Sequence, residues 1–216
     1  MIRRPILGFA EFLFDYKMDT LEDLIKNMEY SLAKDLDNFE KYVEEQAKEY
    51  NEEQKQEYYD YMSDEYWKYK DDYPQIVRKS FFLQAYFSFE HLLIEICKHF
   101  KRKLDLKLEV KDINGQGLER SKIYISKVIG VSSPFQTPNW TKIQHYNQIR
   151  NSFVHNAGEY DENNKKHKAA HQQLKNVDVK NFEFMFNEEF CIEVINTLRE
   201  FTKLIRSEFE TVGNNK

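Results

Sequence analysis

The chain has 216 residues, of which 41% are hydrophobic and 15% aromatic, so it can bury one large core and is short for several independent domains. With six glycines and four prolines, its composition favours long helices over many short strands. The two cysteines, Cys97 and Cys191, lack the spacing of a zinc finger or a disulfide framework, which is typical of a reducing cytoplasm. We therefore predict a single all-α domain, residues 1–216, located in the cytoplasm.

The charged residues are distributed unevenly along the chain. The net charge is −5 overall, but it is −9 over residues 1–100, +7 over residues 101–180 and −3 over residues 181–216. This distribution excludes a general nucleic-acid coat. The basic middle segment can still hold a polyanion at one place.

The first 15 residues, MIRRPILGFAEFLFD, imitate a secretory signal peptide, with two arginines before an apolar run. Glu11 and Asp15 interrupt that run and no small-residue cleavage site follows, so we do not expect export. After this start, apolar residues recur every three or four positions, which predicts amphipathic helices in the first third of the chain. These residues are Leu21, Leu24, Ile25, Met28, Leu32, Leu36, Phe39 and Val43.

Residues 40–73 are dense in Glu, Lys and Tyr, and we predict that they form a helical elaboration of the domain. It is expected to be a long, partly exposed helix or a helical hairpin that ends at Pro74. Its tyrosines could form a platform for nucleic-acid bases, but the acidic surroundings repel phosphate. We favour a solvated helix whose tyrosines pack on the body of the protein or on a partner.

Residues 76–103 form the most apolar helical pattern, expected for a helix buried between others; Phe87 is among its apolar residues. Glu90 and Glu95 within it exclude an uncharged membrane span, so we expect no membrane partner. A buried carboxylate is costly unless it is paired. Glu90 must therefore face a polar seam or meet a cation such as an arginine from another helix.

The segment that follows, residues 101–117, is basic and irregular, with one candidate strand, LKLEV, at residues 106–110 and an Asn-Gly turn signal. The glycines of its Gly-x-Gly lack the rest of a nucleotide-binding fingerprint and predict only a turn. We expect a helix from about Leu118 to Ile129.

A further helix is predicted over residues 138–157, since Thr137 can cap it, Pro138 suits its first position and Gly158 can end it. Near its end it carries a polar set, Arg150, Asn151 and His155. Asn151 and His155 share a face, and Arg150 lies about 140° around the axis from His155, a span its long side chain can bridge. Residues 187–210 form the last predicted helix.

The polar set has an ordinary structural interpretation. Arg150 can pair with a carboxylate, Asn151 can make a local hydrogen bond, and His155 can be a histidine that suits the negative end of a helix dipole. The spacing Arg-x4-His occurs by chance, so spacing alone does not exclude this interpretation.

The wider context favours a functional interpretation. Arg-Asn-Ser-Phe-Val-His-Asn, residues 150–156, follows a helix start that bears Trp140 and an earlier helix of the form SFEHLLIEICKHF. This combination resembles the HEPN superfamily, whose members carry an Arg-polar-x-x-x-His motif on an all-α domain. The resemblance covers residues 76–210 and implies a HEPN-like helical bundle with the two helices side by side. Many such proteins are metal-independent endoribonucleases of toxin–antitoxin and phage-defence systems, commonly homodimers, and others are inactive binding or dimerisation modules.

An arginine and a histidine suit metal-free RNA cleavage, in which a 2′-hydroxyl attacks phosphorus and the products are a 2′,3′-cyclic phosphate and a 5′-hydroxyl. We assign Arg150 to phosphate binding, His155 to proton transfer, and Asn151 to holding His155 or the ribose. Glu90 and Asn156 are expected to support them. The RNA-binding lysines are expected to be Lys142, Lys165, Lys166 and Lys168.

A metal site is the other chemical candidate, because His167 and His171 are four residues apart beside Asp161 and Glu162. The neighbouring lysines repel a cation and no third strong ligand has a fixed spacing. A flexible basic loop that contacts RNA explains the segment as well, so we expect neither a metal nor another cofactor.

Three functions follow from these patterns. The first is a HEPN-type endoribonuclease that acts on RNA as a homodimer, with an antitoxin or defence-system protein as a further partner. The second is a non-catalytic HEPN-like module that dimerises and binds a nucleotide, nucleic acid or protein. The third is a helical scaffold that interacts through residues 40–73. An exposed Arg150 and His155 in a basic groove would favour the first, whereas a local carboxylate that blocks them would favour the others.

Overall fold

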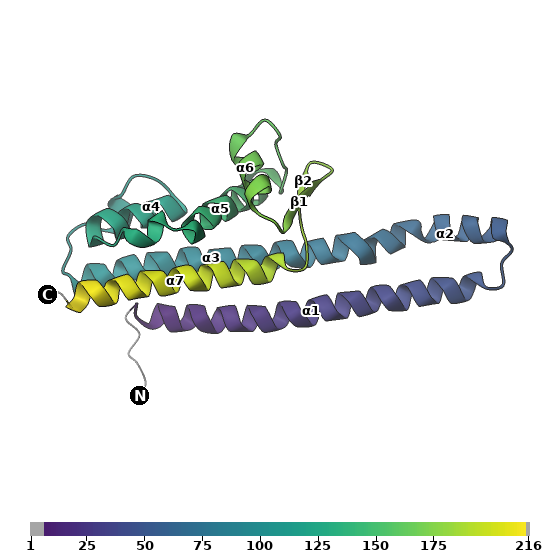
Figure 1. Ribbon diagram of the computed structural model, residues 1–216, viewed down its shortest axis with the longest axis horizontal. Coiled ribbons are helices and arrows are strands. Elements are labelled where there is room, and N and C mark those ends of the chain that lie inside the picture. Colours follow the sequence, from purple (N-terminus) through teal and green to yellow (C-terminus); the bar gives the residue numbers. More distant parts are fainter. Residues whose placement is uncertain (1–6, 215–216) are drawn as a thin grey trace.

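The computed structural model describes residues 7–214. Residues 1–6, with the two arginines of the signal-like start, lie outside the described residues, and residues 9–15 of that start lie in the first helix. The helices are α1 (Phe9–Ala47), α2 (Glu52–Trp67), α3 (Tyr73–Lys103), α4 (Gly117–Ile123), α5 (Pro138–Asn156), α6 (Lys165–Gln173) and α7 (Phe190–Asn214) (Figure 1). The strands are β1 (Val177–Lys180) and β2 (Glu183–Phe186).

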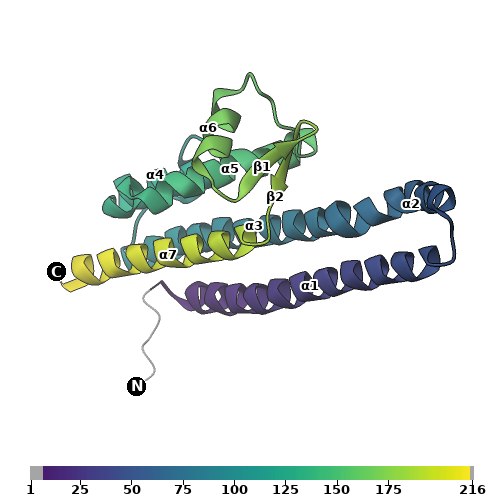
Figure 2. The same ribbon diagram turned by 45° about the vertical axis from the view of Figure 1, so that its right-hand side comes forward.

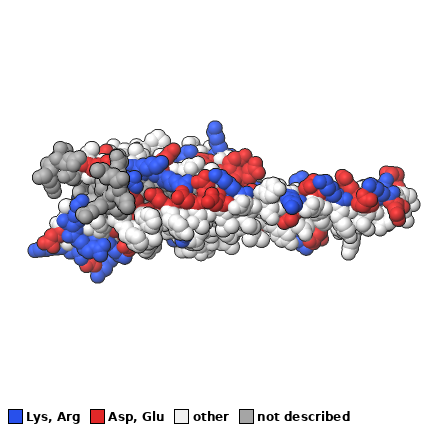
Figure 3. Space-filling model, turned by 90° about the horizontal axis from the view of Figure 1, so that it is seen from below, with Lys and Arg blue, Asp and Glu red and all other residues white. Residues whose placement is uncertain are grey.

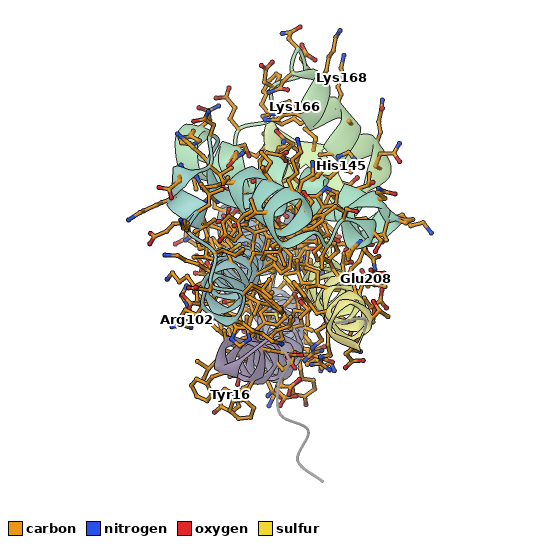
Figure 4. All side chains as sticks on the ribbon, turned by 90° about the vertical axis from the view of Figure 1, so that its left-hand side faces the viewer. Tyr16, Arg102, His145, Lys166, Lys168 and Glu208 are labelled. Carbon is orange, nitrogen blue, oxygen red and sulfur yellow. The ribbon has the colours of Figure 1, made fainter. Side chains whose placement is uncertain are left out.

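The body of the protein is a helical bundle, which confirms the all-α class. Viewed along the long axis, α1 lies below, α3 and α7 lie on either side, and α4 and α5 lie across the top (Figure 4). Phe82 of α3 lies near the centre of the core, with its ring centroid 5.4 Å from those of Phe186 and Phe190 and 6.3 Å from that of Tyr146. Aromatic burial of this kind joins α3, α5 and α7, the three helices that the apolar patterns predict.

The first helix extends far beyond the body. With 39 residues, α1 continues into an arm, defined here as residues 33–67, in which α2 folds back along it (Figures 1 and 2). Of the two forms predicted for this segment, a long helix or a helical hairpin, the structure has the hairpin. Some of its aromatic residues pack within this hairpin and its base, as where Phe39 stacks on Tyr69 with ring centroids 5.0 Å apart. Others face solvent, and Tyr61 is 80% exposed. No residue of α2 is buried.

The prediction that the second helix ends at Pro74 is wrong. Residues 68–72 form one wide π-helical stretch between α2 and α3, and the Tyr73 N–H donates to the carbonyl of Lys68 five residues back. Proline lacks an N–H, and in a regular helix its ring collides with the carbonyl four residues earlier. The wider turn relieves the collision, so the chain stays helical through the proline.

The short strands were placed wrongly by sequence patterns. Residues 106–109 are irregular and Val110 begins a 3-10 turn over Val110–Asp112, while the carbonyl of Leu108 accepts a hydrogen bond from the Tyr124 hydroxyl. The strands instead form one antiparallel hairpin, β1 with β2, whose turn residues Asn181 and Phe182 both have positive φ. An isolated segment such as LKLEV cannot persist as a strand without a partner strand.

Gly158 supports a steric prediction. Its φ is +90°, and an added Cβ would lie 2.4 Å from the Phe153 ring, whereas Gly130, with φ +93°, has open space around it. Both replacements by alanine should strain the backbone by roughly 1 kcal/mol. Only Gly158→Ala should add a collision, so this variant should lose roughly 2–3 kcal/mol of unfolding free energy in total, as measured by urea denaturation. Equal losses in the two variants would show that Phe153 moves aside freely.

Candidate functional site

The helix that bears the candidate site begins and ends largely as its sequence predicts. The Thr137 hydroxyl accepts the Trp140 N–H at 3.4 Å, and Pro138 occupies the first turn of α5. At the other end, Ala157 has φ +52° and the Gly158 N–H donates to the carbonyl of Ser152 at 3.0 Å. These contacts end α5 at Asn156 and place the motif in its last two turns.

Arg150 is held by contacts on several sides. Its Nη2 lies 3.1 Å from Oε2 of Glu90 on α3, and its Nη1 donates to Oδ1 of Asn151 at 3.0 Å. The guanidinium carbon lies 5.1 Å from the ring centroid of Phe87 and 6.0 Å from that of Tyr86. The prediction that Glu90 lies within reach of the motif helix is confirmed, and its partner is the arginine rather than a plain polar seam.

The surroundings of Glu90 make its charge depend on Arg150. Burial raises the pKa of its carboxyl above the usual value, although the charge of Arg150 and a hydrogen bond from the Leu118 N–H oppose the rise. Gly117 lies so close that a Cβ there would be 2.9 Å from Oε1 of Glu90. The start of α4 therefore closes over the carboxylate, and Arg150 is the cation that compensates its charge.

The pairing with Glu90 leaves part of the guanidinium unused. Of the N–H donors that the group carries, one on Nη1 and one on Nη2 are occupied within the described chain. The Nε N–H is buried and has no acceptor there. The side chain keeps 22% of its exposure, so the remaining Nη donors can still meet a ligand.

His155 differs from Arg150 in its surroundings. His155 and its neighbour Asn156 are both exposed at the C-terminal end of α5. Asn151 accepts a hydrogen bond from Arg150, and its expected contact with His155 or the ribose stays a prediction. His155 thus lies exposed in the last turn of α5.

Aromatic contacts to Arg150 were not foreseen from the sequence. Phe87, expected in the core, is 40% exposed and lies over the guanidinium. Tyr86 is buried and donates its hydroxyl hydrogen to Oδ1 of Asn147 at 2.9 Å. The only available signal was spacing, since Phe87 and Tyr86 lie three and four residues before Glu90 on one helix.

The predicted RNA-binding lysines separate into two groups. Lys142 forms an ion pair with Glu193 of α7 at 2.8 Å, so a phosphate would have to compete with that carboxylate, and its role in RNA binding stays a prediction. Lys165, Lys166 and Lys168 lie exposed on α6, and none of them forms an ion pair within residues 7–214. Lys166 and Lys168 project outward above α5 (Figure 4).

The segment that carries these lysines is a helix, so the expected flexible loop is wrong. Asn164 caps α6 by accepting the Lys166 N–H, and Ala170 and His167 face the interior. The Nδ1 atom of His167 accepts the Asp161 N–H at 3.1 Å, and burial lowers the pKa of its imidazole. His167 therefore has a structural role, and no set of three metal-binding side chains gathers anywhere in residues 7–214.

Comparisons with known proteins leave the family open. No protein-family model matches the chain, and neither a curated protein nor a solved structure shows significant similarity to it. Among the helices of the described residues, none combines the length and the apolar character that crossing a bilayer requires.

Proposed function

We propose that the protein is a metal-independent endoribonuclease of the HEPN type. The observation that supports this most is the contrast within one helix end: a guanidinium oriented by Glu90 and Asn151, and an exposed imidazole at His155. The two residues are separated by about 7.5 Å along the helix axis. The proposal requires that one phosphodiester contacts both side chains.

The chemistry assigns a role to each residue. The 2′-hydroxyl loses its proton to a base, its oxygen forms a bond to phosphorus, and the bond to the 5′-oxygen breaks as an acid protonates that oxygen. Arg150 stabilises the added negative charge on the phosphoryl oxygens, and His155 carries one of the two protons. Because proton transfer occurs at both oxygens, a second histidine from a two-fold related copy would complete the site, which supports a homodimer.

The exposed lysines of α6 supply a surface for the rest of the RNA. Lys165, Lys166 and Lys168 can contact phosphates without reading sequence. A role in phage defence or a toxin–antitoxin pair, with an antitoxin or defence-system partner, belongs to this proposal and rests on the resemblance to HEPN proteins.

One observation favours a second function, a non-catalytic HEPN-like binding module. Glu90 compensates the charge of Arg150, so an incoming phosphate must compete with a carboxylate that is already in place. We favour the enzyme, because donors of both Nη atoms remain and the imidazole is exposed. The same residues would serve a module that binds nucleotides or nucleic acid without cutting.

Digestion of single-stranded RNA by the purified protein in EDTA distinguishes the two functions. We expect fragments with 2′,3′-cyclic phosphate and 5′-hydroxyl ends, and no cleavage of the same oligonucleotide with a 2′-deoxy residue at the cut site. Loss of cleavage in EDTA would reject the metal-free mechanism. If the protein binds RNA and forms a dimer in light scattering but never cuts, the binding module is correct.

A further inference from the structure

A groove on the body lies between the start of α1 and the second half of α3. Its volume is about 380 Å³, which falls within the ~300–1,000 Å³ typical of small-molecule sites. The walls are mainly apolar and include Phe9, Leu13 and Phe14 from α1 and Phe87 and Leu92 from α3. Seen from below, uncharged side chains cover much of the lower edge of the body in this view (Figure 3).

Two polar residues of the groove, Lys17 and Arg102, are cations, and burial together with the charges of Lys103 and Arg102 lowers the pKa of the His99 imidazole. Lys17, His91, His99 and Arg102 line the groove. Within residues 7–214, neither Lys17 nor Arg102 forms an ion pair. The one carboxylate, Glu95, is already bound to Lys98 at 2.6 Å. Two cations without an ion-pair partner in residues 7–214, placed beside apolar walls, are complementary to a negatively charged organic molecule.

The two ends of the groove differ. Gly8 crosses His99 so closely that a Cβ would lie 3.1 Å from Nδ1 of the imidazole, and the left-handed φ of +82° suits this glycine. Because α1 and α3 run in opposite directions (Figure 1), Arg102 lies at the end where α1 begins, on the α3 side of the body (Figure 4). Phe87, near the other end, also touches Arg150.

We propose that this groove binds a small organic anion with an apolar body. The anionic group lies at the end formed by His99 and Arg102, and the apolar body extends over Leu92 towards Phe87. The site stands on the geometry of the groove and does not depend on the proposed ribonuclease activity. A bound ligand would also limit the movement of Phe87, the ring that covers Arg150 on the other side.

The test uses two fluorescent probes that share an arylaminonaphthalene body: anionic 8-anilinonaphthalene-1-sulfonate and neutral N-phenyl-1-naphthylamine. Arg102→Glu should weaken binding of the sulfonate by about tenfold or more, because a charge-assisted contact becomes a repulsion. The neutral probe should bind this variant as it binds the wild type. Ser88→Phe, which fills the groove, should weaken both probes.

Two control variants separate an effect at the groove from an effect elsewhere on the surface. Lys103→Glu makes the same change of charge at an exposed neighbour of Arg102 that does not line the groove, and should leave both affinities nearly unchanged. Tyr16→Ser removes a 65% exposed aromatic ring of α1 outside the groove and should have equally little effect. The proposal would be overturned if Lys103→Glu weakened binding of the sulfonate as much as Arg102→Glu does. It would also be overturned if Tyr16→Ser abolished probe binding, or if sulfonate binding survived Arg102→Glu.

Discussion

Replacing His155 by alanine should reduce the proposed RNA cleavage by between about 100-fold and 10,000-fold, the range expected when a proton-transfer group is removed. The fold should survive, because His155 is exposed at the end of α5 and fills no part of the core. The measurement is single-turnover cleavage of a labelled RNA, with far-UV circular dichroism as the check on folding.

His145 provides the matched control for His155. It lies on the same helix, half-buried and outside the motif, so His145→Ala should cleave RNA at close to the wild-type rate. Full activity in His155→Ala would place the proton transfer elsewhere. If both variants lost activity equally, the effect would belong to α5 as a whole rather than to the motif.

Replacing Arg150 by alanine should both impair cleavage and destabilise the fold. Loss of an oxyanion-stabilising donor typically lowers the rate by about 100-fold to 1,000-fold. Removal of the guanidinium also leaves Glu90 buried without its cation, which should lower the free energy of unfolding by roughly 1–3 kcal/mol at pH 8. The measurements are single-turnover kinetics and urea denaturation.

The loss of stability should depend on pH in a defined direction. Burial already raises the pKa of Glu90 above its ordinary value of 4.5, and Arg150 opposes that rise, so its removal raises the pKa further. Between the ordinary and the raised pKa, the folded state binds a proton that the unfolded state has released. Stability of the variant therefore falls as pH rises through this window. Arg150→Ala should lose less stability at pH 5 than at pH 8.

The double variant Arg150→Ala/Glu90→Gln tests this explanation directly. A neutral amide has no buried charge to compensate, so the added pH dependence should disappear and part of the stability should return. Equal destabilisation of Arg150→Ala at pH 5 and pH 8 would mean that Glu90 is not the cause. Arg150 would then act mainly through its contacts with Phe87 and Tyr86.

The strongest predictions from the sequence concern long helices and their ends. The apolar residues of α3, α5 and α7 recur with the helical period over many turns, so their burial follows from local order. Thr137 and Pro138 begin α5 through contacts within one turn, which the sequence contains in full. The need of Glu90 for a partner was predictable for a related reason, because burying a carboxylate is costly whatever the fold.

The features that escaped prediction depend on residues far apart in the chain. In strands β1 and β2, buried and more exposed side chains alternate over only four residues each. The competing segment LKLEV is equally suited to a strand. The presence of a partner strand therefore decides which segment forms one. The continuation of the helix through Pro74 depends on a wide turn that no local sequence pattern predicts. In each case the deciding interaction lies outside the window of sequence that a periodic pattern covers.

The candidate site shows the same division between local and long-range interactions. The order of Arg150, Asn151 and His155 along one helix is a property of the sequence, and so is the chemistry that these side chains can perform. Their present roles depend on α3: Glu90 and Phe87 engage Arg150, which recruits Asn151 and leaves His155 free. Lys142 is likewise engaged by Glu193, 51 residues away. A helical period specifies which residues share a face, but only packing against another helix specifies which partner each side chain meets.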